Sequence, residues 1–298
     1  MPSVGSGRRR LPGGRPAESL WRAMRDTLQT LWRAIRPSTF AVSAVPVAVG
    51  TAWGAHAGRS CHPSLLATAV ACALCLHAGA NLLASLDGAT HPGVESARRL
   101  AGGGALLLLA GGALGGTLVL SRGPLALGFV AACLLLTLSY ALPPPSARGL
   151  GEAAVALGSA LPVAFAAWLQ SGRIGPDTLL AALVIACWAA AIRLCIEMPE
   201  LRADAEAGRH TLAVRLGPQQ APSLYLALQA TAAAALLALG WLADLPAWAT
   251  LPPVATMLVA LAAAPMMMRD RPSQLGALRL TLGIHLGGGL LLVLAALA

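Results

Sequence analysis

The sequence has little charge and contains no lysine. Of its 298 residues, 11% are charged and 57% are hydrophobic, and the mean hydropathy is +0.70. A water-soluble domain of this length would carry about twice that fraction of charged residues. Because so little polar surface is available to cover the apolar segments, the composition excludes a soluble globular protein.

Three further patterns are missing, and each absence excludes a class. The apolar segments do not alternate apolar and polar residues over about ten positions, which argues against a membrane β-barrel. One C-x-x-C pair, Cys72 and Cys75, lies inside an apolar segment and has no second pair, which argues against a structural zinc site. No short apolar region follows the basic N-terminal stretch promptly, so we expect no cleavable signal peptide.

Long apolar segments recur from about residue 38 to the end of the chain. A helix needs about 20 apolar residues to cross a hydrocarbon core of about 30 Å. Nine segments approach this length, at approximately residues 38–57, 64–86, 100–121, 124–142, 150–170, 177–198, 222–243, 248–268 and 276–297. Their richness in Ala, Leu and Gly predicts an all-α, polytopic membrane bundle of about nine transmembrane helices.

The basic residues are distributed unevenly around these segments. All 21 are arginines; eight precede the first segment, and nine lie in the loops expected on the same side of the membrane. Only Arg59, Arg122 and Arg173 lie in the loops of the other side. This positive-inside asymmetry predicts a multi-pass protein of the cell inner membrane with a cytoplasmic N-terminus. Membrane topology therefore accounts for the net charge of +9, and we expect membrane lipid around the chain and no nucleic-acid partner.

The first 36 residues differ from the rest. Residues 1–36 form a basic tail before the membrane domain predicted for residues 37–298. One helical stripe within residues 17–36 consists of Leu20, Met24, Leu28, Leu31 and Ile35. An apolar stripe with arginines largely off it predicts an amphipathic helix at the membrane interface. A pairing face for a partner helix is the alternative.

The segment IEMPELRADAEAGRHTLAVRLG, at residues 196–217, gathers acids and arginines at the end of an apolar span. Glu197, Glu200 and Asp204 have the spacing i, i+3, i+7, which places them on one face of a continuous helix. Carboxylates at a membrane boundary can bind Mg²⁺ together with the phosphate oxygens of a substrate. We therefore interpret the three acids as metal ligands, with Arg209 as a diphosphate contact.

Two alternatives to metal binding remain for these charges. Arg193 lies one helical turn before Glu197 and can pair with it instead of a metal. The whole segment can also be a solvated, charged loop that anchors the ends of the spans. Glu197 argues against the loop, because a carboxylate within a membrane span is expensive and usually functional.

The residues that follow the acids resemble a known signature. DAEAGRHTLAVRLG closely resembles the D-x-x-x-G-[KR]-x-T-L-A-V-R-L-G motif of the UbiA superfamily of intramembrane prenyltransferases. IRPSTFAVSAVPVAVGTAWG at residues 35–54 and SYALPPPSARGLGEAAVALGSALPVAFAAWLQSG at residues 139–172 are similar to two further family segments in the same order. The resemblance is nearest to the 1,4-dihydroxy-2-naphthoate polyprenyltransferases of menaquinone biosynthesis.

The resemblance implies a fold and a reaction. It implies nine helices around a central cavity, with a polyprenyl diphosphate whose tail lies in the bilayer and whose head lies between two Mg²⁺-binding acidic motifs. The implied reaction transfers the polyprenyl group to an aromatic acceptor such as 1,4-dihydroxy-2-naphthoate. A continuous polar path, which a transporter would need, is not evident in the spans.

The sequence departs from the family in its first acidic motif. The matching stretch, NLLASLDGATH at residues 81–91, keeps Asn81 but has Leu82 and Ser85 where two acids are expected. Asp87 is nearby, and in the second motif Glu197 replaces an asparagine. Two interpretations follow: an enzyme with a rebuilt site, or a non-catalytic relative that binds isoprenoid lipid or a partner.

The predicted site contains eight residues. The predicted catalytic residues are Asn81, Asp87, Glu200 and Asp204. The predicted substrate-binding residues are Arg148, Arg209, Tyr140 and Glu197, and the predicted Mg²⁺ ligands are Asp87, Glu197, Glu200 and Asp204. Two residues outside this set also stand out: Glu152 can bind the acceptor or cap a helix, and His77 is best explained as a hydrogen-bonded core histidine.

Overall fold

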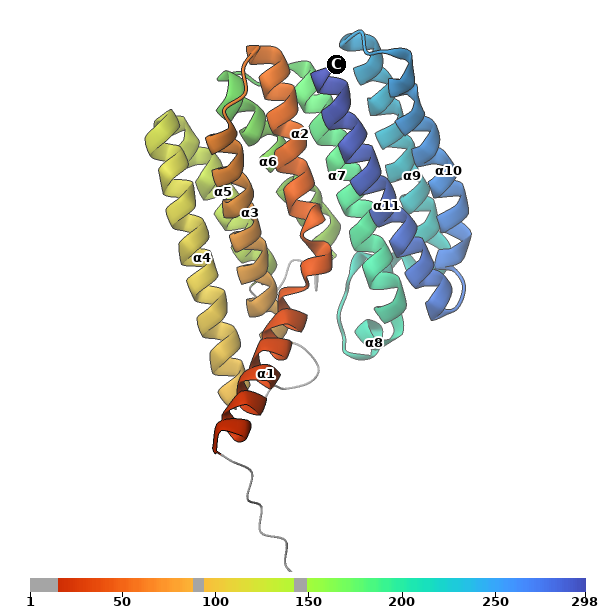
Figure 1. Cartoon of the computed structure of the whole chain (residues 1–298). Helices are drawn as coiled ribbons and strands as arrows, with labels where there is room; N and C mark the ends of the chain where they lie inside the picture. The colour runs from red at the N-terminus through yellow and green to blue at the C-terminus, as the bar shows by residue number, and fades with distance from the viewer. Residues whose placement is uncertain (1–15, 88–93, 142–148) are drawn as a thin grey trace, which may run out of the picture.

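The computed structural model describes residues 16–87, 94–141 and 149–298, and these residues form helices joined by turns (Figure 1). The main helices are α1 (Pro16–Ile35), α2 (Ala41–Gly58), α3 (Pro63–Ala84), α4 (Val94–Arg122), α5 (Pro124–Ala141), α6 (Gly151–Ser171), α7 (Pro176–Glu197), α8 (Leu201–Glu206), α9 (Leu212–Leu242), α10 (Leu251–Met267) and α11 (Arg271–Leu297). The short 3₁₀ turns are η1 (Pro37–Thr39), η2 (Ser85–Asp87), η4 (Met198–Glu200) and η5 (Ala247–Thr250). The described part contains no strand, as the composition predicts.

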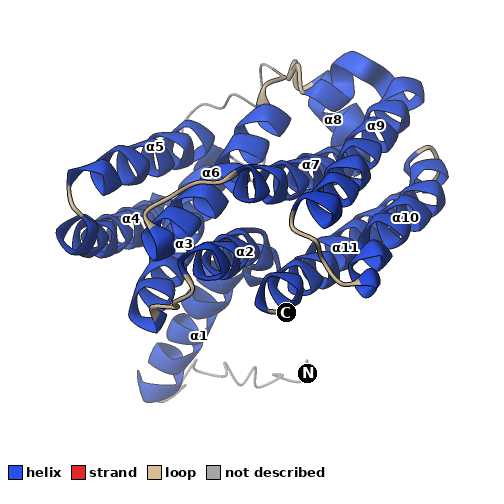
Figure 2. Ribbon diagram, turned by 90° about the horizontal axis from the view of Figure 1, so that it is seen from above, coloured by secondary structure: helices blue, strands red, loops and turns tan. Residues whose placement is uncertain are grey.

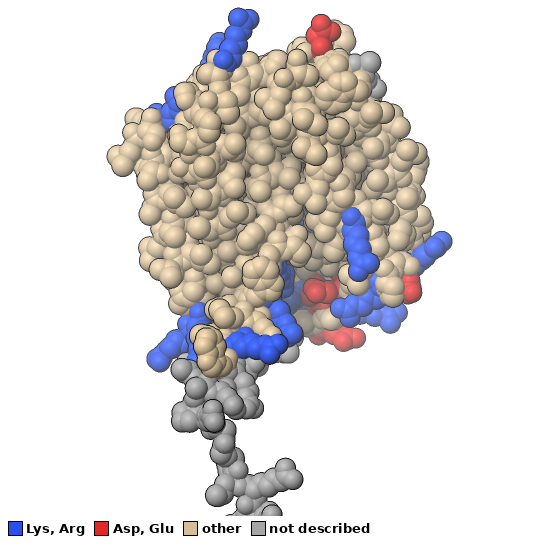
Figure 3. Space-filling model, viewed as in Figure 1, with Lys and Arg blue, Asp and Glu red and all other residues tan. Residues whose placement is uncertain are grey.

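Several of these helices are long and apolar enough to cross a membrane. Among the described residues there are six such helices, or seven if α2 is joined to the end of α1 across a bend of 43°. Two shorter apolar helices, α5 and α10, accompany them. Charged side chains gather at the two ends of the molecule, mainly at the end where α1 and α8 lie, and the side walls in this view are almost free of charge (Figure 3).

The helices form two groups that meet along α7 (Figure 2). One group contains α2 to α6, in which α2 packs on α6 and α3 packs on α4 and α5. The other contains α9, α10 and α11, which pack on one another. Because α7 contacts α2, α6, α9 and α11, it is the most buried of the candidate spans. The residues at its end are therefore surrounded by protein rather than by lipid.

Two glycines allow α2 and α6 to approach closely. A Cβ atom on Gly50 would overlap the backbone of Val163, and one on Gly54 would overlap the backbone of Ala167. Small residues at helix contacts let membrane helices pack through their backbones. This contact fixes α6 against α2, and both helices contribute to the wall of the cavity described next.

Candidate active site

A cavity of about 220 Å³ lies among α2, α3, α4, α5, α6 and α7. Most of its wall is apolar, but one end carries Arg36, Thr39, Ser43, His77, Asn81 and Arg193. These residues come from η1 and its flanks, the start of α2, the C-terminal half of α3 and the end of α7, which lie toward the charged end of the bundle (Figure 1). The cavity thus joins an apolar chamber to a cationic, hydrogen-bonding end.

The backbone between α1 and α2 is held in an unusual conformation. Arg36 has φ 54° and ψ 61°, in the left-handed region that non-glycine residues rarely adopt. The Thr39 hydroxyl donates to the Arg36 carbonyl at 2.8 Å, and the Asn81 side-chain amide donates to the Ile35 carbonyl at 2.9 Å. The two carbonyls are thus fixed by side chains from η1 and α3. Sequence reasoning did not select Arg36, although the I-R-P-S-T stretch was a signal for it.

His77 is fully hydrogen-bonded within the wall of the cavity. Its Nε2 lies 2.9 Å from the Thr39 hydroxyl and its Nδ1 lies 2.7 Å from the Ser43 hydroxyl. The prediction of a hydrogen-bonded core histidine is confirmed. His77 connects α3 to the start of α2, and so supports the Arg36 turn through Thr39.

The end of α7 carries a buried ion pair. The Arg193 guanidinium lies 2.7 Å from Glu197 Oε1, and the side chain of Glu197 is 3% exposed. The backbone N–H of Ala213 donates to the other oxygen, Oε2, at 3.4 Å. Glu197 therefore links the end of α7 to the start of α9 and fixes Arg193, which lines the cavity. The sequence suggested two partners for Glu197, a metal ion and Arg193, and the described structure shows the pairing with Arg193.

A second buried carboxylate lies beside this pair. Glu152, at the start of α6, interacts electrostatically with Glu197 and Arg193. Glu152 is buried, and neither of its carboxylate oxygens has a hydrogen bond of good geometry. The two carboxylates and one guanidinium form a compact charged cluster at the end of α6 and α7.

The three acids of the second motif do not converge. The prediction assumed a continuous helix, but α7 ends at Glu197, and Pro199 lies in the 3₁₀ turn Met198–Glu200 before α8 begins. A 3₁₀ turn has 3.0 residues per turn instead of 3.6, so the shared face is lost. Glu200 is consequently exposed, whereas Asp204 is buried.

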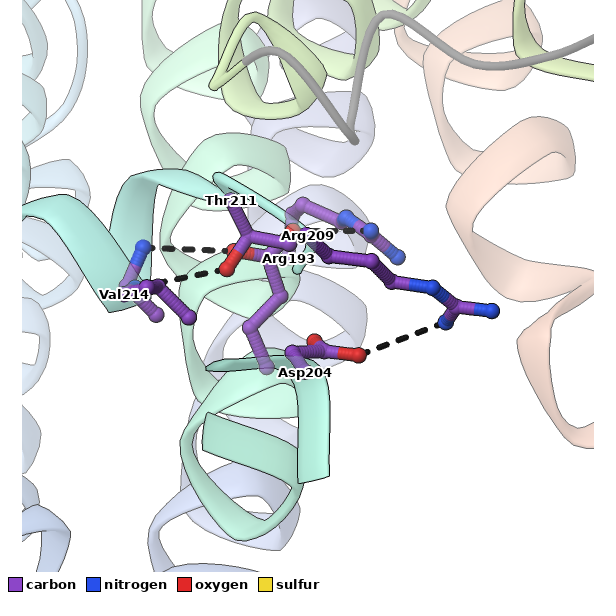
Figure 4. A network of polar contacts seen from close by, with 7 residues as sticks. Arg193, Asp204, Arg209, Thr211 and Val214 are labelled. Atoms are coloured by element: carbon purple, nitrogen blue, oxygen red, sulfur yellow. Dashed lines mark hydrogen bonds and ion pairs between the residues drawn. The ribbon is translucent and has the colours of Figure 1, made fainter. Parts of the chain in front are cut away.

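The carboxylate of Asp204 forms an ion pair with the guanidinium of Arg209 (Figure 4). Arg209 places its guanidinium 3.3 Å from Asp204 Oδ1, and its backbone N–H donates to the Asp204 carbonyl at 2.9 Å. The turn between them includes Gly208 at φ 69°, a conformation that suits glycine. The Thr211 hydroxyl then accepts from Val214 N–H and begins α9. This turn holds the two motif residues together as a pair.

The described residues do not form a magnesium site by themselves. No group of three His, Cys, Asp or Glu side chains converges among them in a way that could hold a metal. Glu197 is paired with Arg193, and Asp204 with Arg209. Arg148 and the side chains of Tyr140 and Asp87 lie outside the described part.

In the first motif, Leu82 and Ser85 stand at the positions where the family resemblance leads us to expect acids. Leu82 is buried in the core with 1% exposure, and the Ser85 hydroxyl donates to the Asn81 carbonyl at 2.7 Å. Asn81 itself is engaged with Ile35. In the described part of this motif, the polar atoms of Asn81 and Ser85 thus hold the backbone.

Fold and site together define an integral-membrane helical protein with an amphipathic cavity. The sequence profile of the UbiA prenyltransferase family matches residues 93–296, which is more than half of the chain, and the chain belongs to this family. No curated protein matches the chain in sequence.

Solved structures of similar fold include a digeranylgeranylglyceryl phosphate synthase, with 12% identity and a TM-score of 0.65 over 91% of this chain and 99% of that one. A UbiA homologue from Aeropyrum pernix K1 has 19% identity and a TM-score of 0.62, with coverage of 84% and 96%. A UbiA homologue from Archaeoglobus fulgidus bound to GPP and Mg²⁺ has 15% identity and a TM-score of 0.63, with coverage of 89% and 99%. These likenesses show the fold.

Proposed function

We propose that this protein transfers a polyprenyl group from its diphosphate to an aromatic acceptor inside the membrane. The observation that carries the proposal is the cavity, which is apolar along most of its wall and cationic at the end lined by Arg36 and Arg193. An isoprenoid tail fits the apolar part, and a diphosphate fits the cationic end. The nearest resemblance supports 1,4-dihydroxy-2-naphthoate, and hence menaquinone biosynthesis, as the acceptor and pathway.

The cavity suits the reacting end of the substrate rather than its whole length. Its volume of about 220 Å³ is below the roughly 300–1,000 Å³ of ordinary ligand pockets, so a long tail extends beyond it into lipid. In the transfer, the bond between the allylic carbon and the diphosphate oxygen breaks, and the electron pair leaves with the diphosphate. A pair of ring π electrons then forms the bond between the allylic carbon and a ring carbon, and the ring regains its aromaticity when that carbon releases a proton or, if it carries a carboxylate, carbon dioxide. The apolar wall keeps water away from the electron-deficient allylic carbon.

The membrane topology that we propose has nine crossings. It counts the six long helices, α2 as the crossing part of the bent α1–α2 pair, and the shorter α5 and α10. The N-terminus, α8 and the polar end of the cavity then share the cytoplasmic side of the inner membrane, with residues 1–36 as the interfacial segment and residues 37–298 as the prenyltransferase domain. The exposed Trp21, Met24, Leu28 and Trp32 of α1 support this interfacial placement.

Magnesium is the cofactor that the family implies, and bound Mg²⁺ supplies countercharge to a leaving diphosphate. Our predicted ligands are Asp87, Glu197, Glu200 and Asp204. The described geometry does not fit such a site, because Glu197 and Asp204 are each paired with an arginine. Glu200, in addition, is exposed. No step in the proposed transfer therefore depends on the ion. Within the described residues, Arg209 and Asp204 form an ion pair, and Asn81 positions the Arg36 turn. Arg209 remains our predicted diphosphate contact.

A second candidate function is isoprenoid binding without turnover. The pairing of Glu197 and Asp204 with arginines favours it, since these acids then provide no metal ligands. In that case the cavity would hold a prenyl diphosphate or another polyprenyl lipid, and no pyrophosphate would be released.

A transfer assay separates the two candidates. The full chain in lipid nanodiscs is incubated with labelled geranylgeranyl diphosphate and 1,4-dihydroxy-2-naphthoate, with Mg²⁺ or with EDTA, and prenylated product and pyrophosphate are both quantified. Product formation that is lost in Asp204→Asn supports the transferase. Retention of labelled lipid without product, unchanged in Asp204→Asn, contradicts it and supports the binding protein.

A further inference from the structure

We propose that the polar end of the cavity is an arginine-based diphosphate site, in which Arg36 and Arg193 supply the countercharge and binding needs no divalent cation. This inference rests on the proposed function only in taking the anion to be the diphosphate of a prenyl diphosphate. It differs from a magnesium-bridged site in one measurable way: the anion remains bound when divalent cations are removed.

Arg193 is held at the cavity wall by residues behind it. Glu197 is buried, lies 2.7 Å from the Arg193 guanidinium, and is itself fixed by the Ala213 N–H. Since Arg193 also lines the cavity, Glu197 acts as a positioning residue that orients the guanidinium for an anion there.

Arg36 lines the same cavity from the turn between α1 and α2. Its left-handed backbone is fixed by two side chains, Thr39, which is itself bonded to His77, and Asn81. A strained backbone that is held by several independent contacts is characteristic of functional positions. Arg36 is exposed and is one of the residues that line the cavity, so these polar side chains together serve to place one cation there.

Four positions of the two acidic motifs offer no free carboxylate to a metal. Leu82 and Ser85 occupy the two acid positions of the first motif, and Glu197 and Asp204 are paired with arginines. Guanidinium groups bind phosphate oxygens through two parallel hydrogen bonds. Two such groups at one cavity end provide directional donors for a diphosphate.

Glu152 distinguishes this site from a metal site. It is buried beside Glu197 and Arg193, and it is a described carboxylate close enough to serve a metal there. In a metal site, Glu152→Gln would remove a ligand and weaken anion binding. In an arginine site, the same change removes a group that does not attract the anion, so binding is retained or strengthened.

The test measures pyrophosphate and geranyl diphosphate binding to the full chain in nanodiscs by calorimetry, with EDTA and with Mg²⁺. We expect binding in EDTA, and a loss of roughly tenfold or more in affinity in Arg36→Gln and in Arg193→Gln. Arg59→Gln is the matched control, because Arg59 is also left-handed and exposed but lies at the other end of α2. Arg36→Gly keeps the left-handed turn and removes the guanidinium, so it replaces Arg36→Gln if that variant does not fold.

Two results would overturn the inference. One is binding that disappears in EDTA and returns with Mg²⁺, and the other is unchanged affinity in both Arg36→Gly and Arg193→Gln. The transfer assay keeps the two proposals apart. Prenyl transfer together with Mg²⁺-dependent binding would support the proposed function and contradict the arginine site. Metal-free binding without prenyl transfer would support the arginine site and contradict the proposed function.

Discussion

The side-chain amide of Asn81 donates to the backbone carbonyl of Ile35 at 2.9 Å, across 46 residues of sequence. This bond ties the C-terminal end of α1 to α3. It thereby orients the backbone that leads into Arg36. An asparagine that the family resemblance assigns to diphosphate binding therefore acts here on the backbone that carries an arginine. The relationship connects the stability of the α1–α2 junction to the polar end of the cavity.

Asn81→Ala should destabilise this junction by about 1–3 kcal/mol, because a buried carbonyl loses its donor. Protection of the Thr39 and Phe40 amides, which bond to the carbonyls of Arg36 and Pro37, from hydrogen exchange should fall, and affinity for geranyl diphosphate should fall with it. Ser85→Ala is the control, since it removes a bond to Asn81 but not the bond to Ile35. Normal protection at Thr39 and Phe40 in Asn81→Ala would show that Asn81 does not position the turn.

Glu197→Ala should be among the most destabilising single changes at the site, by about 3–5 kcal/mol, because it leaves the Arg193 guanidinium buried without its carboxylate. The double variant Arg193→Leu, Glu197→Leu should recover most of this loss. Thermal unfolding in detergent, analysed as a double-mutant cycle, measures the coupling. Additive effects of the two single changes would contradict a buried ion pair.

Gly54→Ala should lower stability by about 1–3 kcal/mol through overpacking, since the added Cβ meets the backbone of Ala167 on α6. Gly116→Ala on α4 is the matched control, because its position has no neighbouring atom within 4 Å. Thermal melting temperatures of the two variants should therefore move in different directions or by clearly different amounts. Equal shifts would show that α2 and α6 do not meet at Gly54.

The start of α11 should depend on pH. The Ser273 hydroxyl and backbone N–H lower the pKa of Asp270 below its ordinary value of 3.8, because they bond the ionised carboxylate. A lowered folded-state pKa means that the cap is complete above the unfolded-state pKa and is lost as pH falls through the folded-state pKa. Hydrogen exchange at residues 271–275 should accelerate below about pH 4. Asp270→Ala should remove this pH dependence, and persistence of the dependence in that variant would assign it to another group.

Arg209→Gln should separate stability from function. Its side chain, which meets Asp204, is 46% exposed, and a partly exposed ion pair contributes less than about 1 kcal/mol. The unfolding midpoint should hardly change. If Arg209 borders the diphosphate as proposed, kcat/KM for the prenyl diphosphate should fall by roughly tenfold. Arg269→Gln, an exposed arginine in the loop before α11, is the control for loss of charge alone.

The sequence alone was enough to predict an all-helical membrane protein, the segments that become its helices and the family signature at residues 196–217. These features depend on local quantities, namely apolar length, arginine placement and motif spacing, which can be read without knowing which helices touch. The pairing of Arg193 with Glu197, which the sequence offered as the alternative to metal binding, belongs here too, because residues one helical turn apart meet in any helix.

Tertiary structure decided which polar atoms are available at the site. Pro199 and a 3₁₀ turn rotate Glu200 away from Glu197, so the acids spaced for one helical face do not share it. The partners of Asn81 and Glu197 come from α1 and α9, and such long-range hydrogen bonds leave no periodic signal in the sequence. A buried polar group must find a partner wherever the packed fold offers one, and that partner is defined only once the helices have come together.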